Sequence, residues 1–256
     1  LLVLLPLCIA MKKHHEIIAN WRSLFVLSLC NMTLPFCLLA YATLSIGAGF
    51  ASILNATVPF FTAILAFAFW QQKLSLTAVM GMLLGFFGVV LLMLSYSGPI
   101  TANAPLKAIA AGLLGAVLYG LAINLTAAHL YKVSGVAITT GSLLFSSIML
   151  LPFAYWQMPD VLPTGSIWFS VFSLGIVCTG FAFVLFYRLI SRIGSNLAVT
   201  NTFLIPLFSL FWGNLFLAEE VTTFMLFACM LVLAGVGMTT GTLARLLIFC
   251  RAKLIR

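Results

Sequence analysis

The residues that could do chemistry in this sequence are amides and hydroxyls inside apolar segments. One group is spaced i, i+3, i+7 and i+10 and so shares one helix face: Ser52, Asn55, Pro59 and Thr62. A second group stands in a later segment: Thr202, Pro206, Ser209 and Gly213. Each proline lacks an N–H and frees the carbonyl four residues earlier, which belongs to Asn55 or Thr202. We expect both stripes to line a watery cavity, because unpaired polar groups are costly in lipid; the alternative is that they join helices.

Four more side chains within apolar segments could hydrogen-bond to a solute or stack on it: Asn31, Tyr119, Asn124 and Trp212. Packing between helices is the other interpretation of these residues. No Asp, Glu, Lys, Arg or His lies near the middle of an apolar segment, although a proton relay or a fixed counter-ion normally needs one. The sequence therefore favours neutral, zwitterionic or amphipathic solutes.

The sequence gives little support for enzymatic or metal chemistry. Residues 15–19 begin like the zinc motif HExxH, but Ala19 stands where the second histidine belongs. The six cysteines stand singly, without CxxC spacing. Glu219 and Glu220 form an acidic pair that either accepts protons or makes a solvated turn. We expect no enzyme, no metal and no cofactor.

The elements that must position these residues are membrane-spanning helices. Hydrophobic residues make up 64% of the 256 residues and charged residues 6%, and the mean hydropathy is +1.24. A helix needs about 20 apolar residues to cross the hydrocarbon core. Such runs occur at 23–41, 47–70, 74–95, 106–128, 136–156, 166–190, 195–217 and 222–243. Residues 1–11 resemble the end of a further helix, so we expect an all-α integral membrane protein whose first helix and part of the second are missing from this chain.

Orientation follows from the basic residues in the short loops, which prefer the cytoplasmic side. Alternating spans place eleven of the twelve Lys and Arg residues inside and only Lys107 outside. The C-terminus of the chain is then cytoplasmic, and the expected location is the cytoplasmic membrane. The chain has too few charges to build a nucleic-acid groove. The expected partners are therefore the lipid bilayer and a small-molecule substrate. A homodimer is left open.

The chain matches itself at an offset of 147 residues. This offset pairs Ile46-Gly47 with Ile193-Gly194, and Pro59 with Pro206, without a gap. Five crossings separate the two copies, so the repeat is inverted, as in many secondary transporters. We expect a ten-helix bundle of two five-helix repeats. Its parts are 1–95, the truncated first repeat; 96–105, a periplasmic linker; 106–243, the second repeat; and 244–256, a basic cytoplasmic tail.

Residues 41–93 and 187–238 resemble the EamA-type transporters of the drug/metabolite transporter superfamily. Both stretches contain a small-residue helix start, a mid-helix proline, an aliphatic and aromatic run, a polar or acidic end and a Gly-rich helix. The resemblance implies two inverted five-helix halves that export or exchange small metabolites. One departure is that Gln71-Gln72 stand where the family has an acidic residue, while the second half keeps Glu219 and Glu220.

These patterns lead to the hypothesis of a secondary transporter that works by alternating access around the two polar stripes. Two other functions stay open. The chain could be a channel or facilitator, although it lacks a filter-like loop or a ring of like charges. It could also be a membrane subunit that transports nothing itself.

Overall fold

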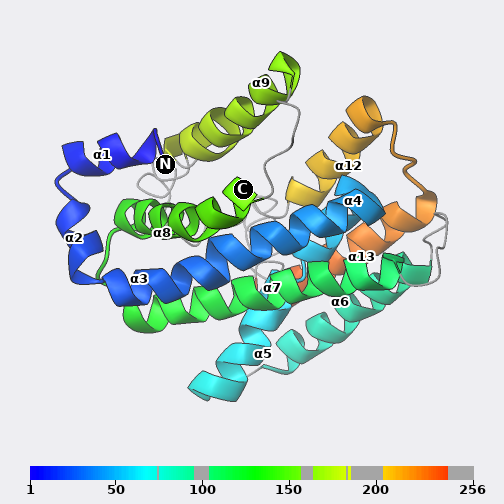
Figure 1. Cartoon of the computed structure of the whole chain (residues 1–256). Helices are drawn as coiled ribbons and strands as arrows, with labels where there is room; N and C mark the ends of the chain where they lie inside the picture. Colours follow the sequence, from blue (N-terminus) through cyan, green and yellow to red (C-terminus); the bar gives the residue numbers. More distant parts are fainter. Residues whose placement is uncertain (74, 95–103, 157–163, 183, 186–203, 242–256) are drawn as a thin grey trace, which may run out of the picture. The chain divides into compact units, whose positions relative to one another are not determined.

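The structure is a computed structural model, and it describes residues 1–73, 75–94, 104–156, 164–182, 184–185 and 204–241. All the regular elements in these residues are helices (Figure 1). In chain order they are α1 (Leu4–Ala10), α2 (His14–Ala19), α3 (Trp21–Ser28), η1 (Leu29–Thr33), α4 (Leu34–Asn55), α5 (Val58–Trp70), α6 (Leu76–Leu94), α7 (Ala104–His129), α8 (Gly135–Trp156), α9 (Gly165–Ser173), η2 (Leu174–Phe181), α12 (Leu204–Leu217) and α13 (Thr223–Thr239). The expected all-α class is confirmed for this part of the chain.

The helices have the length and surface of membrane helices. Three described stretches are long and apolar enough to span a bilayer: Trp21–Asn55, Leu106–His129 and Gly135–Trp156. Five shorter apolar helices accompany them. Large apolar side chains are widely exposed, including Leu44 at 87%, Trp156 at 85% and Phe69 at 71%. An apolar surface on this scale is stable against lipid and unfavourable in water.

The contacts divide the chain into two compact units. Unit 1 comprises Leu1–Thr33 with Leu125–Asn201, and unit 2 comprises Leu34–Asn124 with Thr202–Arg256. Each unit therefore combines segments from both of the sequential halves that the sequence suggests.

In unit 1, α3 and η1 pack along α8. A Cβ added to Gly141 of α8 would lie 2.9 Å from Leu24 Cδ1, so the two helices approach closely. The Ser28 hydroxyl donates to the Ser142 carbonyl at 2.7 Å, and the Thr33 hydroxyl donates to Ser146 Oγ at 3.1 Å. Small residues and hydroxyls thus hold this pair together, as expected for helices that have no hydrophobic driving force between them in lipid.

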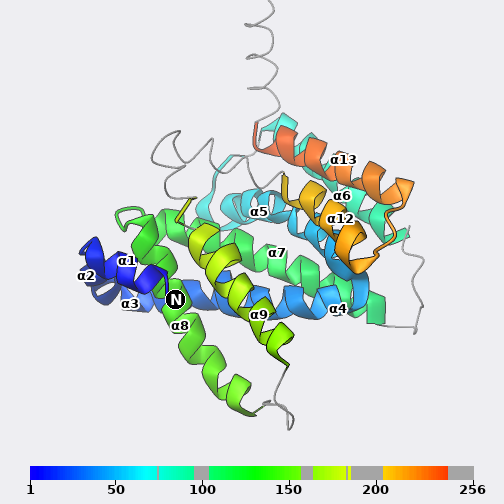
Figure 2. The ribbon, with the colours of Figure 1, turned by 90° about the horizontal axis from the view of Figure 1, so that it is seen from above.

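In unit 2, α6 and α13 lie side by side in both views (Figures 1 and 2). A Cβ on Gly81 would lie 2.6 Å from the Gly235 carbonyl oxygen. A Cβ on Gly88 would lie 3.0 Å from the Ala228 carbonyl oxygen. The offset of 147 residues carries Gly81 to Ala228 and Gly235 back to Gly88, so each of these two contacts is the counterpart of the other.

Helix ends 147 residues apart also share their local structure. Gln71 ends α5 and Ala218 follows α12, and each has a φ of 52°. The next residue then bonds back into its helix: Gln72 N–H donates to Ala66 O at 3.2 Å, and Glu219 N–H donates to Gly213 O at 3.1 Å.

The start of the following helix matches as well. Ser75 Oγ accepts from Ala78 N–H at 3.1 Å, and Thr222 Oγ1 accepts from Met225 N–H at 3.2 Å. The same offset carries η1 to residues 176–180 of η2, so π-helical turns occur at both positions.

Three expected helices differ from the sequence prediction. The end expected at 41 is wrong, because α4 continues from Leu34 to Asn55. The single helix over 47–70 is wrong, because α4 ends at Asn55 and α5 begins at Val58. Pro59 lies in the first turn of α5, where its missing N–H costs nothing, and so it restarts the helix instead of bending it. The helix expected over 166–190 is α9 followed by η2 in its described part.

Candidate functional site

The break between α4 and α5 leaves polar groups of one residue unpaired. Asn55 is the last residue of α4, and its side-chain Oδ1 is buried without a hydrogen-bond partner in the described part of the chain. Its backbone carbonyl cannot receive the usual helical bond either, because Pro59 has no N–H. The N–H of Thr57, two residues after Asn55, donates to Leu54 O at 3.1 Å. Asn55 therefore offers two acceptor oxygens at one point.

The rest of the first stripe is engaged by its own helices. Ser52 donates to Gly49 O at 2.7 Å, and Thr62 donates to Val58 O at 2.9 Å. Because the helix is interrupted at Ala56 and Thr57, the predicted i to i+10 spacing does not form one continuous helix face. The predicted single face is therefore wrong: Ser52 and Asn55 belong to α4, and Pro59 and Thr62 belong to α5.

Asn124 fixes α7 to α5. Its Nδ2 donates to Thr62 O at 3.0 Å and to Gly120 O at 2.9 Å, and the residue is 8% exposed. A Cβ on Gly120 would lie 2.8 Å from Thr62 N, so the two helices are in close contact. These bonds favour the interhelical interpretation of Asn124, and its role toward a solute stays a prediction.

The second stripe is described only in part. Thr202 lies outside the described residues, and Pro206 is buried in α12. Ser209 donates to the carbonyl of Ala48 in α4 at 3.0 Å. Gly213 makes room for an acid, because a Cβ there would lie 2.6 Å from Glu219 Oε2.

Glu219 has a structural role that the sequence analysis did not predict. Its Oε1 accepts the N–H of Ala48 at 2.7 Å, and its Oε2 accepts the N–H of Gly49 at 3.0 Å. Gly47, just before them, has a φ of 76°, which kinks α4 and exposes the amides of a new helix start. The carboxylate thus caps this helix start, where negative charge is favourable. We call this contact the Glu219 clamp.

Three glycines make the space for the Glu219 clamp. A Cβ on Gly47 would lie 2.8 Å from Glu219 Oε1, and one on Gly49 would lie 3.3 Å from Oε2. With Gly213, they surround the carboxylate from both helices. Asn214 donates to the Glu219 carbonyl at 2.9 Å and fixes the turn after α12, while Glu220 is exposed. The sequence shows Gly47, Gly49 and Gly213, but residue spacing alone does not reveal that all three surround the Glu219 carboxylate.

The remaining candidates occupy three different settings. Asn31 is half-buried in η1 of unit 1, and Tyr119 is half-buried in α7 of unit 2. Trp212 is 47% exposed and stacks on Phe216 with ring centroids 5.3 Å apart. Nothing in these positions tests a role toward a solute, so the three roles stay predictions.

Comparison with known proteins identifies relatives along nearly the whole chain. The model of the EamA-like transporter family matches residues 1–94 and 106–241. The uncharacterized transporter YoaV of Bacillus subtilis is 24% identical over 213 residues, which cover 81% of this chain and 72% of YoaV. An uncharacterized transporter of Archaeoglobus fulgidus is 27% identical over 220 residues, which cover 85% of this chain and 78% of the relative.

A solved crystal structure has a similar fold. It is 19% identical in sequence, covers 93% of this chain and 96% of its own, and has a TM-score of 0.53. The family match confirms the resemblance that the sequence motifs indicate, and with the apolar helices it makes the chain a transmembrane protein. The chain belongs to the EamA-like transporter family.

Proposed function

We propose that this protein is a secondary transporter that moves small neutral, zwitterionic or amphipathic metabolites or drugs across the cytoplasmic membrane, by export or exchange. Its family and the transporter names of its relatives support the general function. The uncharged character of the candidate site supports the solute class, because Asn55 offers oxygens without a fixed charge.

The observation that carries the proposal is the broken helix at Asn55. A buried amide oxygen without a partner costs about 1–3 kcal/mol, so proteins retain such groups where they serve a purpose. In transporters, interrupted helices supply the polar groups of the substrate site within the membrane. The solute would donate an N–H or O–H to Asn55 and so remove this cost while it is bound.

Matching local structures support an inverted ten-helix repeat. The paired caps, the two π-helical segments and the reciprocal contacts of α6 and α13 all follow the same offset of 147 residues. Each contact unit also combines segments of both halves, as expected when a twofold axis relates the halves. In alternating access, the two halves would then move between two equivalent arrangements, each open to one side of the membrane.

The position of the Glu219 clamp is suited to hold such a transporter closed on one side of the membrane. It joins the end of α12 to the helix start after Gly47, so it must open if these elements separate. The equivalent position in the first half is Gln72, an amide that lacks the negative charge of Glu219. We propose that the clamp strengthens closure on the periplasmic side.

Metabolite profiling of cells and spent medium tests the proposed function. The gene is expressed as wild type, as Asn55→Leu and as Ser147→Leu at matched membrane abundance. Ser147 is an exposed hydroxyl on α8 that bonds its own helix, so it controls for a polar residue changed to leucine. We expect one metabolite class to accumulate outside with wild type and Ser147→Leu, but not with Asn55→Leu.

The outcomes separate the function from the site. Equal profiles for wild type and Asn55→Leu, both different from an empty vector, would retain transport and contradict the site. Profiles identical to the vector for every variant would contradict export as the function.

A further inference from the structure

Glu219 is a carboxylate whose negative charge is held by uncharged partners. Its two oxygens accept the N–H groups of Ala48 and Gly49, at 2.7 Å and 3.0 Å. Among the residues that the structure describes, the one ion pair joins Lys13 and Glu16, which belong to unit 1. The Glu219 clamp therefore depends on charge-assisted hydrogen bonds from backbone amides and not on an ion pair.

Few other groups on the elements around the clamp can take up a proton. The helices α6 and α12 contain no titratable side chain. The titratable groups of α4 and α13 are Cys37, Tyr41 and Cys229, whose thiol and phenol groups gain no proton on acidification. Glu220, beside the clamp, is exposed. On acidification these elements therefore gain protons at Glu219 and Glu220.

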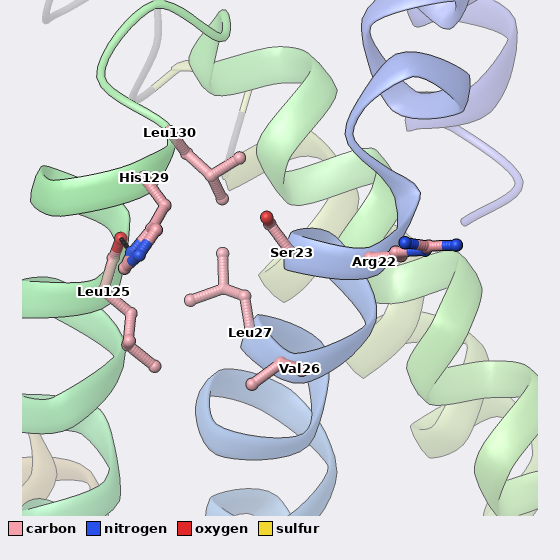
Figure 3. A pocket seen from close by; sticks show the side chains of 7 residues that line it. All are labelled: Arg22, Ser23, Val26, Leu27, Leu125, His129 and Leu130. Carbon is pink, nitrogen blue, oxygen red and sulfur yellow. Dashed lines mark hydrogen bonds between the residues drawn. The ribbon is translucent and has the colours of Figure 1, made fainter.

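The other charged groups leave this assignment intact. In the described part of unit 2 the basic residues are Lys73 and Lys107, which gain no charge on acidification. All three histidines, which do gain charge, belong to unit 1. His14 and His15 are in α2, and His129 lines a pocket between α3 and the end of α7 (Figure 3). A response of unit 2 to acid thus points to the acidic turn after α12.

A proton on Glu219 removes one of its two acceptors. The protonated oxygen becomes an O–H donor, so it no longer accepts the amide N–H that faces it. The other oxygen keeps its hydrogen bond, but this bond loses the charge assistance and the favourable interaction with the partial positive charge of the helix start. Proton uptake therefore weakens the Glu219 clamp, and by linkage an open clamp takes up a proton more readily.

We propose that proton uptake by Glu219 releases the Glu219 clamp, so that a proton from the periplasmic side favours the arrangement open to that side. This inference rests on the proposed function, in which the clamp strengthens closure there. The proton passes from water to a carboxylate oxygen, and the amide that this oxygen leaves turns to water. Glu219 is half-buried in the turn after α12, so water reaches it.

Two observations favour a proton acting on one side of the membrane. Both oxygens of Glu219 already face N–H donors, an arrangement that repels a metal cation. The repeat-equivalent residue in the first half is Gln72, whose amide does not titrate. Acid should therefore act on the clamp without a matching effect at Gln72.

Double electron–electron resonance measures this opening without measuring transport. Spin labels are attached at Leu44→Cys on α4 and Leu217→Cys on α12, in the full chain with its six native cysteines changed to serine. Both side chains are exposed, at 87% and 64%. We expect a short distance at about pH 8, and a longer distance whose population rises about tenfold at about pH 4. Glu16 stays ionised throughout, because its hydrogen bond from Lys13 lowers its pKa to about 2.

Two variants assign the response to one carboxylate. Glu219→Gln should show the longer distance at both pH values, because the amide keeps one acceptor and binds no proton. Glu220→Gln should respond to pH as wild type does. The proposal is overturned if the wild-type distances do not change with pH, if Glu219→Gln still responds, or if Glu220→Gln abolishes the response.

A transport assay on the same samples separates this inference from the proposed function. Solute transport with distances that ignore pH would overturn the proton-released clamp alone. Distances that follow pH through Glu219, without movement of any solute, would support the proton-released clamp and contradict the transporter.

Discussion

At the residue scale, two of the four acids bind backbone N–H groups at helix starts. Glu219 caps the part of α4 that follows Gly47, and Glu16 accepts the N–H of Ser134 just before α8. Amides at a helix start lack partners within the helix and carry partial positive charge, so a carboxylate satisfies both needs. In a chain with so few charges, acids used in this way define how segments far apart in sequence meet.

The first prediction concerns Glu219. Glu219→Gln keeps one acceptor oxygen but turns the other bond into a contact between two donors. Because charge-assisted hydrogen bonds contribute about 1.5–3 kcal/mol, the variant should lower the free energy of unfolding of unit 2 by about that amount. Thermal unfolding in detergent measures the effect. The adjacent exposed Glu220→Gln is the control, with a change within about 0.5 kcal/mol. Equal losses in both variants would show that the clamp adds nothing.

The second prediction concerns pH and Glu16. Its folded pKa of about 2 lies below the unfolded value of about 4.3, so its ionised form stabilises the folded state. This contribution is full above about pH 4.3 and disappears as the pH falls through about 2. The melting temperature of wild type should therefore exceed that of Glu16→Gln near neutral pH, and the difference should shrink on acidification. A difference that is constant with pH would contradict this assignment.

At the element scale, the sequence predicted where the apolar helices lie better than where they break. The positions of α6, α7, α8 and α13 agree with the predicted spans within a few residues, because their apolar runs are bounded by loops. The sequence predicted a helix start at 47, where Gly47 kinks α4, but it did not predict the break at Ala56, since hydropathy does not change there. A broken helix depends on partners that satisfy its ends, and the main one, Glu219, is 171 residues away from Ala48.

The third prediction concerns the contact of α6 with α13. Gly235→Ala places a methyl group against the Gly81 carbonyl, within a backbone approach that neither helix can relax locally. We expect a lower melting temperature in detergent, with a loss of about 1–3 kcal/mol, as for overpacking. Gly175→Ala is the matched control, because a Cβ there meets nothing within 4 Å and alanine favours helices. Stability of Gly235→Ala equal to wild type would contradict the close packing.

At the scale of the whole molecule, the sequence predicted a family and an internal symmetry from glycines, prolines and helix boundaries. The structure adds paired features that spacing cannot reveal, such as the left-handed residues Gln71 and Ala218 at the two helix ends. The candidate site was predicted only in part. Asn55 is left with an unpaired acceptor, Thr62 bonds to Val58 in its own helix, and Asn124 bonds to the Thr62 carbonyl of another helix, a partner that sequence alone cannot identify.

The proposed inverted repeat makes one demand that can be measured directly. Lys73 and Glu220 are 147 residues apart, equivalent by the repeat, and both exposed. In a background where the six native cysteines are serine, Lys73→Cys and Glu220→Cys are labelled separately with a membrane-impermeant maleimide. The proposed architecture predicts that Glu220→Cys reacts in intact cells, and that Lys73→Cys reacts only after the cells are permeabilised. If both positions reacted from the same side, the two halves would run in the same direction, and alternating access through inverted repeats would be contradicted.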